Sequence, residues 1–153
     1  MEIIDYKNEY FIDVFDVVHK TIGEIYPKYY PAQAVEFFHN HHSLENMRKK
    51  LPNEYTKIIL EDGKIIGTGS VDKNEINRFF VLPNFQNKGY GKIILKELEN
   101  TIKKNNYKKI TLASSLGAVF FYRKCGYEYY DYKIISVEEG QYLCYLEMEK
   151  EID

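Results

Sequence analysis

The sequence predicts a mixed α+β fold, built on a mostly antiparallel sheet of about seven strands. Three observations predict it. Apolar residues recur at helical spacing over 11–25 and 94–102. Short strand-like runs alternate with turn signals, of which Asp62-Gly63 is the clearest. One helix is enclosed between two strands in the second half of the chain, and such a strand–helix–strand unit is expected to be right-handed.

The first third of the chain reads as one strand followed by helices. We expect the strand at Glu2–Tyr6. The apolar face of the first helix is formed by Phe11, Phe15, Val18, Ile22 and Ile25. Pro27 ends this helix, and Pro31 opens a second one, because proline suits the first turn. Ser43 is placed to cap a third, Leu44–Leu51.

The remaining elements alternate strands with two helices. Strands are expected at Tyr55–Glu61, Lys64–Val71, Glu75–Leu82, Lys109–Ala113, Tyr127–Val137 and Gln141–Glu149. The helices are expected at Gly89–Lys104 and Leu116–Cys125, the second stopped by Gly126. We expect the last strand to be an exposed sheet edge that can pair with a partner, so monomer and homodimer both stay open.

Size and composition narrow the class of protein. The 153 residues suit one globular domain, 1–153. The formal net charge is -2 and no basic stripe is present, which argues against a nucleic-acid partner. The two cysteines, Cys125 and Cys144, form no pairing or metal pattern, as expected for a reducing compartment. The charged N-terminus and the lack of a long apolar run predict a cytoplasmic protein with no membrane partner.

The stretch from Val81 to Lys92 carries the chemistry. A strand ends at a proline, a short polar turn follows, and Gly89 and Gly91 open a helix. The first amides of a helix have no internal partners and favour an anion, and glycine lets a phosphate approach them. A Walker loop is excluded because Gly91-Lys92 is followed by Ile93, and a Rossmann fingerprint lacks its third glycine. Taken alone, the two glycines are equally typical of a tight strand-to-helix turn.

The wider pattern resembles the GNAT acetyltransferases. Gln86-x-x-Gly89-x-Gly91 is similar to the family's pyrophosphate signature, and the segment Glu75–Val81 before it looks like the family's central strand. Downstream, Ala118-x-x-Phe121-Tyr122-x-x-x-Gly126 resembles its second hallmark. The resemblance implies a three-layer fold with helices on both faces of the sheet. The match is specific over 75–127. It departs from the family at 113–117, where the usual asparagine is replaced by Ser114 or Ser115.

The resemblance implies acetyl-CoA as cosubstrate, with the pantetheine arm lying beside the strand Glu75–Leu82. The implied cofactor-binding residues are Phe79, Phe80, Val81, Gln86, Asn87, Lys88, Gly89, Tyr90, Gly91, Lys92 and Ser114. The Val81 amide would polarise the thioester carbonyl. Lys88 and Lys92 are equally typical of solvated surface lysines.

The implied reaction is direct attack of a primary amine on the thioester, in a ternary complex. A free alkylamine has a pKa of about 10, so it must lose a proton, and Glu75 is the candidate base. Glu75 is equally typical of an exposed carboxylate with no catalytic role beside the turn Asp72–Asn74. Tyr122 matches the position of the family's proton donor to the leaving thiolate, and its alternative is a buried packing tyrosine. Cys125 has no histidine near it in sequence, which argues against a thiol nucleophile.

The acceptor is expected to be a small-molecule amine or a peptide. The aromatic connection Tyr26–Pro31 borders the acceptor pocket in this fold, so Tyr26, Tyr29 and Tyr30 are candidate substrate contacts, with core packing as the alternative. The histidines at 39, 41 and 42 lie near Glu36, but no second ligand group completes a metal site, and no metal is expected. A longer acyl-CoA, or a non-catalytic acyl-CoA-binding or sensing module, stays open.

Overall fold

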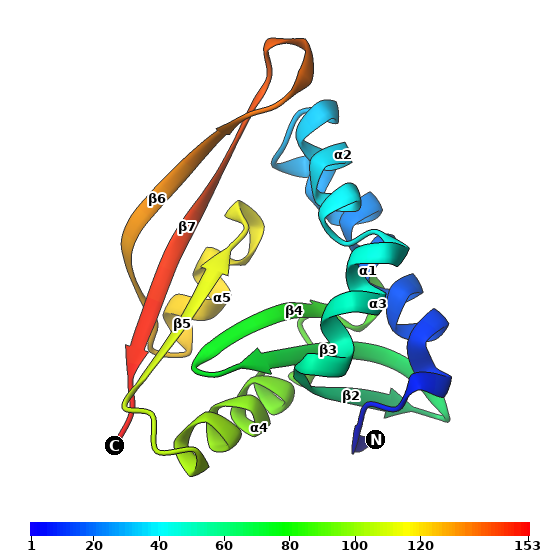
Figure 1. Ribbon diagram of the computed structural model, residues 1–153, viewed down its shortest axis with the longest axis vertical. Coiled ribbons are helices and arrows are strands. Elements are labelled where there is room, and N and C mark those ends of the chain that lie inside the picture. Colours follow the sequence, from blue (N-terminus) through cyan, green and yellow to red (C-terminus); the bar gives the residue numbers. More distant parts are fainter.

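A single seven-stranded sheet, in the order β1-β2-β3-β4-β5-β7-β6, forms the centre of the computed structural model, which describes residues 1–153. Its strands are β1 (Glu2–Asp5), β2 (Tyr55–Glu61), β3 (Lys64–Asp72), β4 (Glu75–Val81), β5 (Lys109–Ser114), β6 (Glu128–Ser136) and β7 (Tyr142–Glu151). All neighbours pair antiparallel except β4 and β5. Figure 1 shows the β6–β7 hairpin projecting beyond the rest of the sheet.

Helices cover both faces of this sheet (Figure 1). They are α1 (Phe11–Ile25), α2 (Ala32–His41), α3 (Leu44–Lys50), α4 (Tyr90–Lys104) and α5 (Val119–Lys124). Gly67 and Gly69 share one face of β3 and lie directly under Ile94 and Leu98 of α4. Helix α1 packs on β3 and β4 as well, so it must cover the opposite face. The mixed α+β fold with helices on two sides is therefore confirmed.

Most element boundaries match the sequence predictions to within one to three residues. Ser43 caps α3 as expected, its hydroxyl accepting from the Asn46 amide at 3.2 Å. The prediction that the last strand is the sheet edge is wrong. Strand β7 lies between β5 and β6, so β6 is the edge. The reason is the hairpin: β7 returns antiparallel to both neighbours and pairs along β5 from Lys109 to Ser114.

The parallel strands β4 and β5 are paired only over the start of β4 and the middle of β5. Their register contains two pairs, Glu75 with Thr111 and Ile76 with Leu112. Beyond this point β4 carries a bulge, in which Arg78 adopts a left-handed backbone at φ 45°. A bulge bends its strand and ends regular pairing. The two strands therefore part toward their carboxyl ends and leave an opening in the middle of the sheet.

A buried ion pair anchors the bulge. The Arg78 guanidinium contacts the Glu54 carboxylate just ahead of β2, and both side chains are almost fully buried. Burial lowers the pKa of Arg78 to about 10, so the guanidinium stays charged at neutral pH. A charge at this depth needs its partner, because an unpaired buried charge is strongly destabilising.

The main core fills both sides of the sheet. Helix α4 contributes Ile94, Leu98 and Ile102, all without exposed surface, as its helical periodicity predicts. On the opposite face, Val14, Val18 and Ile22 of α1 are equally buried and belong to the same cluster. None of the helices has the length and apolarity needed to cross a membrane.

The space around two glycines, one in β3 under α4 and one in α1, predicts opposite effects of adding a methyl group. A Cβ at Gly67 would lie 2.8 Å from Ile59 and 2.9 Å from Ile94, whereas one at Gly23 in α1 would meet nothing nearer than 3.9 Å. Gly67→Ala should lower the free energy of unfolding by about 1–3 kcal/mol through overpacking. Gly23→Ala should raise it by about 0.5–1 kcal/mol, because alanine is the better helix former. Urea denaturation measures both, and equal stability of the two variants would contradict this packing.

Candidate active site

A cavity of about 530 Å³ lies where β4 and β5 have parted. It is bounded by α1, the end of β4, the turn before α4 and the segment that leads into α5. Its lining residues are Thr21, Ile25, Tyr26, Phe79, Phe80, Val81, Gln86, Asn87, Gly89, Gly91, Lys92, Ser115, Gly117, Ala118, Phe120, Phe121 and Lys124. Both sequence motifs therefore meet at one cavity, one on each side of it.

The end of β4 presents backbone groups to this cavity. The Leu82 amide donates to the Ile66 carbonyl of β3 at 2.8 Å. Neighbouring residues of an antiparallel strand point their backbone groups to opposite sides. The amide and carbonyl of Val81 therefore face away from β3, toward the gap that β5 has left. This is the place where an amide donor can act on a ligand lying between the two strands.

The other end of the cavity is the N-terminus of α4. Gly89 caps the helix with a left-handed backbone at φ 91°, which glycine adopts without strain. The first intrahelical bond runs from the Ile93 amide to the Gly89 carbonyl, so the amides of Tyr90, Gly91 and Lys92 have no partner inside the helix. The first turn contains no acidic residue, which leaves the helix dipole uncompensated.

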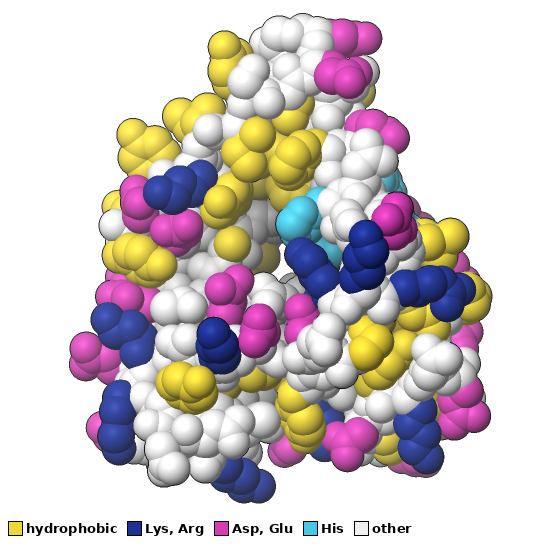
Figure 2. Space-filling model, viewed as in Figure 1, with side chains coloured by type: hydrophobic (Ala, Val, Ile, Leu, Met, Phe, Trp, Pro, Cys, Tyr) yellow, Lys and Arg dark blue, Asp and Glu magenta, His cyan; other side chains and the backbone are white.

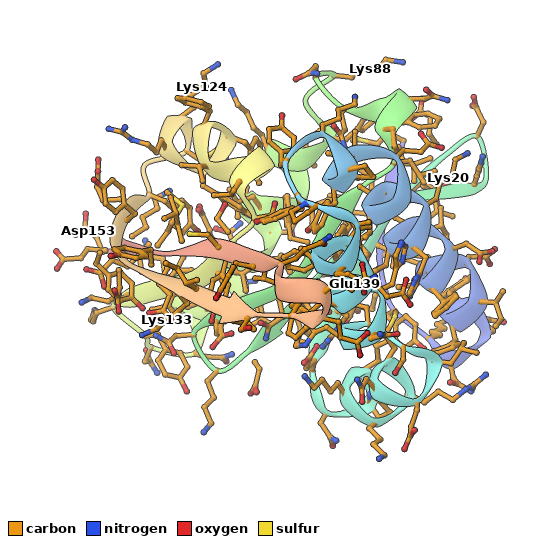
Figure 3. The ribbon with its side chains drawn as sticks, turned by 90° about the horizontal axis from the view of Figure 1, so that it is seen from above. Lys20, Lys88, Lys124, Lys133, Glu139 and Asp153 are labelled. Atoms are coloured by element: carbon orange, nitrogen blue, oxygen red, sulfur yellow. The ribbon has the colours of Figure 1, made fainter.

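The charges around the cavity have one sign. Lys92 and Lys124 are among its 17 lining residues, and none of these is an aspartate or glutamate. Lys88 and Lys124, from the turn before α4 and from α5, extend on the same side of the molecule (Figure 3). Two lysines beside three unpartnered helix amides form a site for a polyanion.

Not every residue of the first motif faces the cavity. The Lys88 ammonium lies 5.4 Å from the centre of the Phe85 ring, and Tyr90 packs on the same ring at 6.1 Å. Gln86 does line the cavity, but its Nε2 donates to the Val81 carbonyl at 3.0 Å. The Gln86 amide is also occupied, because it donates to the Pro83 carbonyl at 3.2 Å. The free amides therefore begin after Gln86.

Tyr122 sits behind the cavity wall. It is 5% exposed and packs against the rings of Phe79, Phe121 and Tyr127, with centroids 5.2–5.8 Å away. Phe79 and Phe121 line the cavity, whereas Tyr122 does not. Burial raises the pKa of Tyr122, so its phenol is protonated at neutral pH. The protonated phenol thus lies one ring away from the cavity.

Glu75 begins β4 and therefore lies at the opposite end of that strand from Val81. Its side chain is exposed, and partial burial together with Asp72 and Glu147 raises its pKa. Figure 2 shows a hollow between the β6–β7 hairpin and α2, with acidic side chains at its lower edge. Glu75 does not line the cavity between the strands. Any action on a group in that cavity would need water between them.

Some cavity residues were missed by the sequence analysis. Ser115, which the sequence did offer as the alternative to Ser114, lines the cavity, whereas Ser114 is buried and its hydroxyl donates to the Ser115 carbonyl. Lys124 follows Tyr122 by two residues, and a search around the second motif for cations would have found it. Thr21 carried no signal, because a threonine on the inner face of an amphipathic helix is ordinary.

The aromatic connection Tyr26–Pro31 divides into three roles. Tyr26 lines the cavity beside Phe80, and burial raises its pKa to about 12. Tyr29 is half-exposed, its ring packed against Gly117. Tyr30 is buried, and its hydroxyl donates to the Cys144 carbonyl at 2.7 Å and accepts from the Leu116 amide at 2.9 Å. Tyr30 therefore joins three segments that are far apart in sequence.

The four histidines lie together where α1 meets α2. The Nδ1 atoms of His19 and His39 are 2.8 Å apart, and His19 Nε2 lies 2.6 Å from the His42 carbonyl, to which it donates. Desolvation lowers the pKa of His39, and that of His42 falls well below its usual value. No group of three or more histidine, cysteine, aspartate or glutamate side chains is placed to hold a metal.

Comparison with known proteins agrees with this fold. The family model described as an acetyltransferase (GNAT) domain matches residues 26–152, and the chain belongs to the GNAT acetyltransferase family. No curated protein matches the sequence.

Solved structures are similar to the chain at low sequence identity, and they show the fold alone. A GCN5-related N-acetyltransferase from Rhodopseudomonas palustris is 19% identical, with a TM-score of 0.91 over 99% of this chain and 95% of that one. The PaiA N-acetyltransferase from Thermoplasma acidophilum, in complex with coenzyme A, is 20% identical, with a TM-score of 0.73 over 99% and 100%. A GNAT acetyltransferase from Elizabethkingia anophelis with acetyl-CoA bound is 20% identical, with a TM-score of 0.59 over 72% and 84%.

The contacts of Tyr30 predict a structural cost when its hydroxyl is removed. Tyr30→Phe leaves the Leu116 amide and the Cys144 carbonyl without their partner, and should lower the free energy of unfolding by about 1–3 kcal/mol. Tyr29→Phe is the matched control, because its half-exposed hydroxyl makes no hydrogen bond within the protein. Urea denaturation compares the two, and a Tyr30→Phe variant as stable as the parent would contradict the joining role.

Proposed function

We propose that the protein transfers an acetyl group from acetyl-CoA to a primary amine, by direct attack in a ternary complex. One observation carries the proposal: the gap between β4 and β5 leads straight to the unpartnered amides of α4, in a cavity with two lysines and no carboxylate. An extended arm with a pyrophosphate at one end fits such a cavity. Membership of the GNAT acetyltransferase family supports the same reaction.

Cofactor binding would use both ends of the cavity. The amides of Tyr90, Gly91 and Lys92 would hold the pyrophosphate, with Lys92 and Lys124 adding charge. The amide arm would pair with the free side of β4 as an added strand, since that side has lost β5. The acyl group would then lie beside Val81, whose amide faces the gap.

The chemical steps follow from these positions. A neutral amine attacks the thioester carbon, a C–N bond forms, and the oxygen that becomes negative accepts from the Val81 amide. The C–S bond then breaks and the sulfur takes a proton, for which Tyr122 is the donor on our proposal. The amine proton leaves through water toward the face that carries Glu75, whose raised pKa suits a base.

A non-catalytic acyl-CoA-binding module is the second candidate function. The buried position of Tyr122 behind Phe79 and Phe121 is the observation that favours it. Tight CoA binding, with no free thiol released by any amine, amino acid, polyamine or peptide, would identify such a module. The proposed enzyme releases thiol with at least one of these acceptors.

Acetyl-CoA should stabilise the protein, because a ligand that binds only the native state shifts unfolding by mass action. At 100 times its Kd the gain should be about 2.7 kcal/mol, visible as a higher Tm. ATP and NAD at equal concentration should give much smaller shifts. A flat thermal shift at millimolar CoA would overturn the proposal.

Gly91→Val should weaken CoA binding, because its side chain would crowd the α4 amides and Phe121.

Tyr122→Phe should separate the acid role from packing. The ring and its contacts with Phe79, Phe121 and Tyr127 stay, and only the hydroxyl is lost. If Tyr122 protonates the thiolate, kcat should fall by about 10²–10⁴-fold with CoA affinity unchanged. Steady-state kinetics and isothermal titration with CoA measure the two quantities. A kcat close to that of the parent would make Tyr122 a packing residue and water the proton donor.

A further inference from the structure

The Gln86 side chain lines the cavity, yet its carboxamide is engaged by the protein itself, although Gln86 opens the polar turn that leads to α4. Its carboxamide lies 3.0 Å from the Val81 carbonyl. Because that carbonyl can only accept, the atom of Gln86 that faces it must be the nitrogen. The backbone amide of Gln86 is engaged by the Pro83 carbonyl at 3.2 Å. Neither of these contacts points Gln86 toward a phosphate in the cavity.

A second element meets the same carbonyl. The Thr21 hydroxyl, from α1, lies 3.4 Å from the Val81 carbonyl and 2.7 Å from the Val17 carbonyl. A hydroxyl has one hydrogen, so the bond to Val17 is the main one and the contact with Val81 is longer and shared. Thr21 is buried and lines the cavity. Val81 is thus approached from the turn before α4 and from α1.

These contacts fix the rotation of one peptide unit. The Leu82 amide donates to Ile66 on β3, and the Val81 carbonyl on the other side of that peptide is held by Gln86. A strand residue points its amide and carbonyl to the same side. Holding the Val81 carbonyl on the gap side therefore holds the Val81 amide there as well. The neighbouring β5 cannot do this, because it has already parted from β4.

We propose that Gln86 is a positioning residue for acyl transfer, which orients the Val81 amide by holding the Val81 carbonyl, with Thr21 as a weaker second contact. The inference rests on the proposed acetyl transfer and concerns the same cavity. It assigns the first residue of the glycine motif to the thioester end of the cavity rather than to the pyrophosphate end.

The two assignments of Gln86 predict different kinetics. If Gln86 positions Val81, Gln86→Leu should lower kcat by about 3- to 10-fold, the value of one hydrogen bond, and leave the Kd for CoA within about twofold. Gln86→Glu should lose more, because a carboxylate cannot donate to the carbonyl and repels it. Asn84→Ala, an exposed change in the same turn, is the control and should match the parent. A weaker CoA affinity with unchanged kcat would mean that Gln86 binds the pyrophosphate, and would overturn the proposal.

A measurement without turnover tests the contact itself. Val81-Leu82 is the only Val-Leu pair in the sequence, so labelling carbonyl carbon in valine and nitrogen in leucine gives one NMR correlation for this peptide. Gln86→Leu should move the Val81 carbonyl resonance upfield, Thr21→Val should move it less, and Thr21→Ser should leave it in place. An unmoved resonance in Gln86→Leu would overturn the proposal. If the parent transferred no acetyl group, the proposed function would fail while this measurement still reported on the contact.

Discussion

The parting of β4 and β5 is the constraint on which the rest of the structure depends. Two parallel strands that remained paired would fill the middle of the sheet and leave no cavity. The bulge at Arg78 separates them. The ion pair with Glu54 lets the charged Arg78 side chain stay buried beneath that bulge. Everything that meets at the cavity, from the end of β4 to the amides of α4, is brought there by this break in an otherwise continuous sheet.

The sequence predicted the elements well, because its signals were local. The periodicity of Ile94, Leu98 and Ile102, the cap at Ser43 and the turn at Asp62-Gly63 each depend on residues within one turn or one hairpin. Sheet order depends on long-range pairing, and there the prediction of an exposed last strand was wrong. The β6–β7 hairpin folds back so that β7 reaches β5, and nothing in the β7 residues alone specifies that neighbour.

The site divides in the same way. The glycine motif located the N-terminus of α4 correctly, because consecutive residues determine that turn. The motif could not predict the direction in which each side chain points. Gln86 turns to Val81 and Ser114 turns to its own neighbour. Tyr122 lies one ring behind the wall, and Thr21 and Lys124 enter from elements that no single motif connects. These placements follow from tertiary packing, which periodicity does not encode.

The edge of the sheet has a consequence for how the protein behaves when concentrated. Strand β6 exposes Tyr129, Tyr132 and Ile134, a composition that favours stacking of strands between molecules. Its backbone is not freely available, because the Asp131 carboxylate accepts from the Tyr132 amide at 2.8 Å and a bulge follows Tyr129. Lys133 lowers the pKa of Asp131, so this cover stays ionised into mildly acidic solution. The Asp131 carboxylate and the bulge thus both work against pairing of this tyrosine-rich edge with a second molecule.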